Sequence, residues 1–172
     1  METTYVYIAD LAVSQNEGLL VTIGLGSCVG VALYDAKRKI AGLVHILLND
    51  SKQYLRDRSN QFNPAKFADT AIPELIKAME ERGASRGALV AHLAGGSQLF
   101  DYKFDGVGIG QKNIEAARAK LKELGIAILS EDTGGDYGRT MKINAGSGEV
   151  IISSLSKEKK LTFINPRGVG SD

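Results

Sequence analysis

The sequence predicts an α+β fold: a single domain with a layered, largely antiparallel, sandwich-like β-core flanked by two main helices. Short runs rich in Val, Ile, Leu and Tyr recur along the chain, as is typical of strands. Glycine is abundant, with 20 residues, and proline is scarce, with 3, which favours a turn-rich strand protein. Only two segments show helical periodicity. Strands precede, separate and follow these segments, so the order departs from a doubly wound parallel sheet.

Four apolar runs before the first helix are expected to be strands. They cover residues 5–9, 19–23, 28–34 and 40–48. The polar residues 35–38 are expected to close a hairpin between the third and fourth runs. Residues 49–63 are polar and aperiodic, which indicates a long surface loop of the kind that is often functional.

The first helix is expected to start at Asn63–Pro64, with Asn as N-cap, and to end near Gly83. The second should cover residues 111–124. Further strands are expected at residues 87–94, 126–129, 140–143 and 150–153. We expect residues 1–164 to form the domain and the polar, glycine-rich residues 165–172 to form a flexible tail.

Composition excludes several classes of function. The formal net charge is +1, which does not favour nucleic acid or an anionic membrane as a partner. No apolar run approaches the ~20 residues that span a bilayer, and the N-terminus does not resemble a signal peptide. One cysteine and two dispersed histidines predict neither an internal disulfide nor a metal site. We therefore expect a cytoplasmic protein, not embedded in a membrane, with no metal or other cofactor.

The predicted hairpin register pairs Cys28 with His45. If residues 35–38 form the loop, Tyr34 lies opposite Lys39, and in the same register Cys28 lies opposite His45. Directly opposite residues have Cβ atoms roughly 4.5–5.5 Å apart. The register therefore predicts a thiol beside an imidazole, although a slip of one residue would move them to opposite faces.

A thiol beside an imidazole suits nucleophilic catalysis. An imidazolium would favour the thiolate of Cys28, and His45 would then act as acid and base. Thr22, in the preceding strand, is a candidate to orient the histidine. The backbone of Gly26 and Ser27, with the N–H groups of Ser27 and Cys28 as donors, is the candidate oxyanion site. The alternative is that Cys28 is a small buried hydrophobe and His45 a core histidine.

Several stretches resemble the CheD family of chemoreceptor glutamine deamidases. The most specific is Val-Thr-Ile-Gly-Leu-Gly-Ser-Cys-Val-Gly-Val, residues 21–31, followed by Gly-Leu-Val-His-Ile-Leu-Leu, residues 42–48. Further collinear matches occur at residues 67–73, 94–97, 108–113, 131–135 and 138–139. The resemblance therefore covers nearly the whole chain.

The resemblance implies a function, a fold and partners. It places the nucleophile at Cys28, the histidine at His45 and the third member at Thr22. It implies hydrolytic deamidation of glutamine to glutamate on the cytoplasmic helices of chemoreceptors, through a thioester and with release of ammonia. It also implies a fold similar to the catalytic domain of a bacterial toxin deamidase. A CheC-type phosphatase is the second implied partner, and Leu99 and Phe100 are candidates for its binding patch.

Two other functions stay open at this point. The chain can be a non-catalytic or dual-role partner that regulates the CheC phosphatase, or a thiol enzyme with another amide or ester substrate. Departures from the family pattern fall outside the candidate catalytic residues. Asn49, Ser97 and Lys112 stand where proline, alanine and arginine are common. These departures concern the partner surface more than the chemistry.

Overall fold

The computed structural model describes residues 1–53, 62–99, 108–154 and 161–163. It confirms an α+β fold with two α-helices and two sheets. The strands are β1 (Thr3–Tyr5), β2 (Leu11–Gln15), β3 (Leu19–Leu25), β4 (Val29–Asp35), β5 (Ile40–Ile46), β6 (Leu89–Gly95), β7 (Ala127–Thr133), β8 (Arg139–Asn144), β9 (Val150–Ser153) and β10 (Leu161–Phe163). The helices are α1 (Ala68–Glu81) and α2 (Ile109–Glu123).

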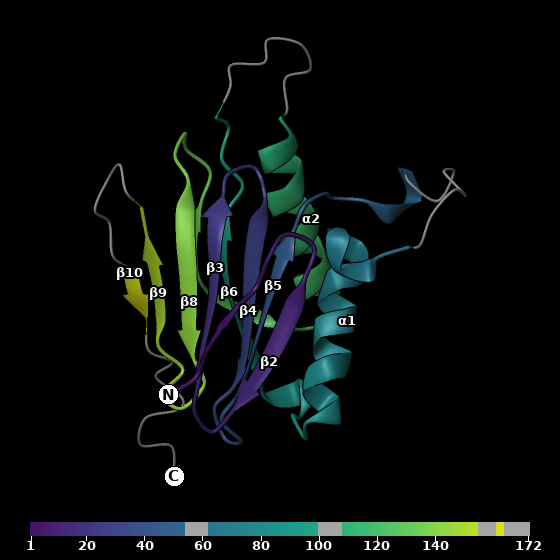
Figure 1. Ribbon diagram of the computed structural model, residues 1–172. Helices are drawn as coiled ribbons and strands as arrows, with labels where there is room; N and C mark the ends of the chain where they lie inside the picture. Colours follow the sequence, from purple (N-terminus) through teal and green to yellow (C-terminus); the bar gives the residue numbers. More distant parts are fainter. Residues whose placement is uncertain (54–61, 100–107, 155–160, 164–172) are drawn as a thin grey trace.

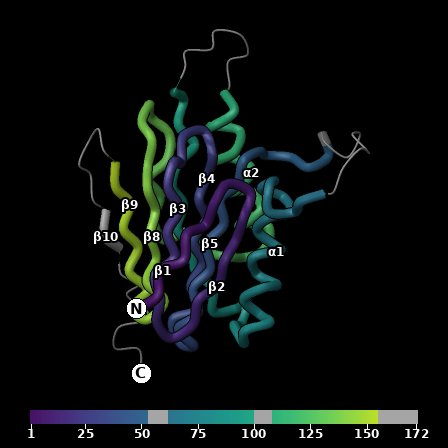
Figure 2. The backbone as a smooth tube through the Cα atoms, viewed as in Figure 1, coloured from purple at the N-terminus to yellow at the C-terminus, as the bar shows by residue number. Residues whose placement is uncertain are grey.

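The two sheets stack face to face, and the helices cover one of them (Figure 1). One sheet has the order β1-β3-β8-β9-β10, and the other has the order β2-β5-β4-β6-β7. Most neighbours are antiparallel, as expected, but β1 pairs with β3 and β6 with β7 in parallel. The backbone trace shows β1 beside β3 at the N-terminal end of the chain (Figure 2). The layers are therefore sheet, sheet and helix pair.

Alternation along β4 explains why this strand is apolar throughout. Val29, Val31 and Leu33 belong to the core between the helices and the second sheet. Ala32 and Tyr34 belong to the core between the two sheets. Because successive side chains point to opposite faces, a strand covered on both faces shows a continuous apolar run. The inter-sheet core is the layer that also receives Cys28.

The hairpin register differs from the prediction by two residues. Asp35 pairs with Ile40, so residues 36–39 form the loop and His45 lies opposite Gly30. The cause is the fully buried Asp35 carboxylate, which accepts hydrogen bonds from the backbone N–H of Arg38 and of Ser85. Asp35 therefore ends the strand, where the sequence had placed it in the loop.

The start of the first helix also differs from the prediction. Asn63 does cap a turn, but this is a separate 3₁₀ turn, Pro64–Lys66. Phe67 is extended and buried, and its backbone bridges Leu48, so the α-helix begins only at Ala68. Strand β2 was not predicted, and the first strand, predicted at residues 5–9, lies earlier at Thr3–Tyr5. Within the described residues, neither helix combines the length and the apolar character needed to cross a bilayer.

Candidate active site

Thr22 and His45 meet between the two sheets. Thr22 lies on β3 of the first sheet and His45 on β5 of the second. Both are fully buried, and the threonine Oγ1 lies 2.7 Å from His45 Nδ1. The strands that carry Thr22 and His45 lie in different sheets, so this contact joins the two layers through buried polar groups.

The hydrogen bonds of Thr22 fix the proton on His45. The Thr22 hydroxyl has one hydrogen, and it donates this hydrogen to the carbonyl oxygen of Val6 at 2.6 Å. Toward His45 the hydroxyl can therefore only accept, so Nδ1 carries the imidazole proton. Nε2 is then unprotonated and carries a lone pair. It has no hydrogen-bond partner within the described residues. The site holds a neutral imidazole with an unused basic nitrogen.

Burial favours the neutral forms of both candidate catalytic groups, Cys28 and His45. Desolvation lowers the pKa of His45 to about 4. Desolvation also raises the pKa of the Cys28 thiol, an effect that its own backbone N–H opposes. These directions argue against the imidazolium–thiolate pair anticipated from the sequence, because each charge loses hydration in the core. The resting pair is thiol and imidazole.

Cys28 lies in the turn that joins β3 to β4. A register shift in the β3–β8 pairing falls between Thr22 and Leu25, and Gly24 within it has a φ of +80°, which favours glycine. Cys28 is 6% exposed. It precedes the β4–β5 ladder, where Gly30 faces His45, so a continued ladder would make Cys28 a diagonal neighbour of His45. A diagonal neighbour shares the face of its partner.

The turn at residues 26–28 has its three carbonyl groups occupied. The carbonyl of Gly26 accepts from the Ser97 N–H, and that of Cys28 accepts from the Gly96 N–H, each at 2.8 Å. The carbonyl of Ser27 accepts from the side-chain amide of Asn113 at 2.9 Å. The Gly26 N–H donates to the carbonyl of Gly24. By contrast, no backbone acceptor within the described residues engages the N–H of Ser27 or Cys28.

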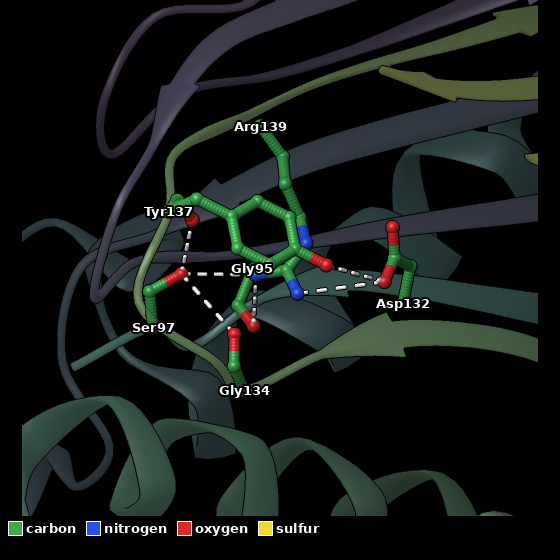
Figure 3. A network of polar contacts seen from close by, with 6 residues as sticks. All are labelled: Gly95, Ser97, Asp132, Gly134, Tyr137 and Arg139. Carbon is green, nitrogen blue, oxygen red and sulfur yellow. Dashed lines mark hydrogen bonds and ion pairs between the residues drawn. The ribbon is translucent and has the colours of Figure 1, made fainter. Parts of the chain in front are cut away.

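A buried arginine braces the segment that holds this turn (Figure 3). Arg139 is 3% exposed, and it lies 3.4 Å from the Asp132 carboxylate. It donates to the Ser97 hydroxyl at 2.9 Å and stacks over the ring of Tyr137. Ser97 Oγ donates to the Tyr137 carbonyl at 2.5 Å. The network fixes residues 95–97, and their backbone in turn holds Gly26 and Cys28.

A cavity of about 160 Å³ opens beside the turn, at the start of α2. It is lined by Ser27, Ser97, Gln98, Leu99, Gly108, Ile109 and Gly110. Leu99 is 49% exposed, which suits the surface role anticipated for it, whereas Phe100 lies outside the described residues. Within the described part of the chain, no group of three His, Cys, Asp or Glu side chains is placed to hold a metal ion.

The fold and these side chains define a class: a layered α+β protein in which a thiol, an imidazole and a hydroxyl occupy one inter-sheet layer. Comparison with known proteins makes the class more specific. A family model described as CheD chemotactic sensory transduction matches residues 47–154. That segment begins after His45, so the candidate catalytic residues precede it.

Curated relatives match most of the chain. A protein of Moorella thermoacetica is 48% identical over 157 residues, covering 90% of this chain and 92% of the relative. One of Lachnoclostridium phytofermentans is 44% identical over 161 residues, covering 92% and 98%. Each is named a probable chemoreceptor glutamine deamidase CheD. The chain belongs to the CheD family.

A solved structure supports the fold alone. The crystal structure of Neisseria meningitidis protein NMB0706, of family DUF152, aligns with a TM-score of 0.53 at 15% identity. The alignment covers 80% of this chain and 65% of that one, so the chain spans just under two thirds of its length. At this identity the similarity concerns only the layered α+β architecture.

Proposed function

We propose that the protein hydrolyses the side-chain carboxamide of glutamine residues on chemoreceptors, giving glutamate and ammonia. The names of the relatives support this substrate. The observation that carries the chemistry is the Thr22–His45 contact, since it leaves His45 Nε2 as an unused base on the strand that pairs with β4, which begins directly after Cys28. On this proposal the protein acts in the cytoplasm, where the resemblance places the helical receptor segments that it would modify. We treat residues 1–164 as the single unit that carries this activity.

In the first half of the reaction, Cys28 attacks the carboxamide carbon. As the C–S bond forms, His45 Nε2 takes the thiol proton, so no free thiolate needs to accumulate in the core. The N–H groups of Ser27 and Cys28 face no backbone acceptor, and they stabilise the oxyanion. The imidazolium then gives its proton to the leaving nitrogen, the C–N bond of the tetrahedral intermediate breaks, and ammonia departs to leave a thioester on Cys28.

In the second half, water cleaves the thioester. Neutral His45 takes a proton from the water as its oxygen attacks the carbonyl carbon. The C–S bond breaks, and the proton returns to the sulfur, which regenerates the thiol of Cys28. Thr22 keeps the acceptor position at Nδ1 throughout and stabilises the imidazolium more weakly than a carboxylate would.

A deamidation assay tests this proposal. The protein is incubated with a purified cytoplasmic fragment of a chemoreceptor, and peptide masses are followed. We expect each event to raise the mass by about 1 Da, because OH replaces NH₂. Cys28→Ala should abolish the change while circular dichroism shows an unaltered fold. Continued conversion by a folded Cys28→Ala protein would refute the mechanism. Conversion of other amides but never of receptor glutamine would refute the substrate.

Exposed Leu99 at the cavity supports a second partner, a CheC-type phosphatase, in addition to the receptor. Leu99 and Ile109 are both exposed and line the same cavity, and neighbouring exposed apolar side chains are suited to contact with another protein. We expect Leu99→Asp to weaken binding of such a phosphatase in a titration, while Cys28 keeps its rate of alkylation. Unchanged phosphatase binding would remove Leu99 from the partner surface.

A further inference from the structure

Asn113 connects the chain segments that carry the two reacting groups. It is fully buried on α2, and its side-chain amide donates two hydrogen bonds. One goes to the carbonyl of Ser27, directly before Cys28, at 2.9 Å. The other goes to the carbonyl of Leu47, two residues after His45, at 3.1 Å. A single planar group therefore sets the separation of these two segments.

This contact lies just beyond the last pair of the β4–β5 ladder, Val29 with Ile46. Directly opposite residues of an antiparallel pair exchange backbone hydrogen bonds only at alternate positions. The Cys28 carbonyl faces β6 and accepts from Gly96, and the Leu47 N–H donates to the carbonyl of Lys66. The amide of Asn113 therefore adds a side-chain connection at a position where these two strands exchange no backbone hydrogen bond.

Close packing at two glycines, Gly96 and Gly110, brings Asn113 within reach of the turn at residues 26–28. A side chain at Gly110 would collide with the carbonyl oxygens of Gly96 and Ser97. A side chain at Gly96 would collide with Ile114. The start of α2 can therefore lie directly against residues 96–97, the segment that also holds the turn. This placement sets Asn113 beside the turn.

Stability alone is a poor explanation for this residue. Within the described residues, Asn113 Oδ1 is buried and has no hydrogen-bond partner. An unsatisfied buried acceptor is unfavourable, which offsets part of what the two donated bonds contribute. Asn113 carries this unfavourable contribution at the point where the segments of Cys28 and His45 meet. Positioning these two groups therefore explains the residue better than stability does.

We propose that Asn113 is a positioning residue that holds Cys28 in register with His45. The inference rests on the proposed function, because it assumes that these two groups react together. Asn113 touches neither thiol nor imidazole in this account. It acts through the carbonyls of Ser27 and Leu47, and so controls how far the sulfur lies from Nε2.

The test is a double-mutant cycle on the reactivity of Cys28, which needs no receptor. The rate of alkylation by iodoacetamide is measured for the wild type, Asn113→Ala, His45→Ala and the double variant. We expect Asn113→Ala to slow alkylation roughly 10-fold or more in the wild-type background, because small displacements of reacting groups are costly. In the His45→Ala background, Asn113→Ala should change the alkylation rate by less than about twofold, since the imidazole with which Cys28 is held in register is already gone.

A purely structural role predicts the opposite pattern. Asn113→Ala would then change alkylation by the same factor in both backgrounds, and that result would overturn the proposal. Asn144→Ala is the matched control. Asn144 caps the turn after β8 by accepting from Gly146 and Ser147, and its loss should leave Cys28 reactivity unchanged. If Asn113→Ala does not fold, Asn113→Leu keeps a similar volume and loses both donors without burying a charge, and the same cycle applies.

Receptor deamidation separates the two proposals. We expect Asn113→Ala to lower kcat by roughly 10- to 100-fold with KM unchanged, because the residue does not contact substrate. A wild type that alkylates in a His45-dependent way but deamidates no receptor would refute the proposed function and leave the coupling intact. An active wild type with an equally active Asn113→Ala would refute the role of Asn113 alone.

Discussion

His45 and His92 occupy nearly identical environments at two places in the same layer. Both are fully buried, and burial lowers the pKa of each to about 4. In each ring Nδ1 lies 2.7 Å from a hydroxyl, that of Thr22 for His45 and that of Ser130 for His92. A shifted pKa with a hydroxyl contact therefore marks burial and does not by itself identify a catalytic base.

The neighbours of the two histidines make the difference. His45 pairs with Gly30, at the end of the ladder where Cys28 follows. His92 pairs with Ala32 in the middle of the second sheet, between β4 and β7. Its partners in that register are Ala32 and Ser130, and neither is a cysteine. Position relative to the thiol, and not burial, therefore distinguishes His45 from His92 in the proposed mechanism.

The largest expected effect comes from removing each imidazole in turn. His45→Asn should lower the rate of deamidation by roughly 100- to 10,000-fold, because it removes the acid and base of both steps. His92→Asn should leave the deamidation rate of the folded protein within about threefold of the wild-type rate, because neither His92 nor the residues around it contact substrate in the proposed mechanism. The two rates are compared in the mass assay. A large loss in His92→Asn with an intact fold would break the comparison.

A smaller effect should follow from removing each hydroxyl. Thr22→Val keeps the shape but removes the acceptor at Nδ1, so the tautomer with a free Nε2 is no longer enforced. We expect kcat to fall roughly 10-fold, the low end for an orienting group. Ser130→Ala removes the equivalent contact to His92 and should leave kcat unchanged. Equal losses in the two variants would show that both hydroxyls act through stability.

The sequence was most informative where burial leaves a continuous apolar run. The strands around the site were expected within a few residues, because covering a strand on both faces favours apolar side chains throughout. The half-buried β2, Leu-Ala-Val-Ser-Gln, lacks that signal and was missed. The hairpin register was wrong because the side chain of Asp35 binds Arg38 and Ser85, a contact that loop composition does not reveal.

The residues of the candidate site likewise divide into those that the sequence indicates and those that only the fold reveals. Cys28 and His45 could be proposed because they fall on neighbouring strands of one predicted hairpin, and the resemblance to the CheD motif added Thr22. Asn113 and Arg139 lie in stretches that match the family, residues 108–113 and 138–139, but no role could be assigned to them, since each is one polar residue in an ordinary helix or strand. Their partners Ser27 and Ser97 lie 86 and 42 positions away. Contacts of that range leave no local pattern, and only the fold brings them together.

The smallest effect concerns acid stability, in which the two histidines should be equivalent. For each, the folded pKa of about 4 lies below the ordinary value of 6.5. Between these values the unfolded chain binds more protons, so the free energy of unfolding should fall as the pH decreases from 6.5 to 4. Each histidine contributes at most about 1.4 kcal/mol per pH unit. Above pH 7 both contributions are constant.

Urea unfolding at pH 5 and pH 7 measures this effect. The non-titrating substitutions His45→Gln and His92→Gln should each reduce the difference in unfolding free energy between the two pH values by a similar amount, although only the first abolishes deamidation. Equal effects on stability with unequal effects on activity would separate burial from catalysis at these two positions. A pH dependence that is unchanged in His92→Gln would show that His92 already titrates normally in the folded protein, and the two environments would then differ from the start.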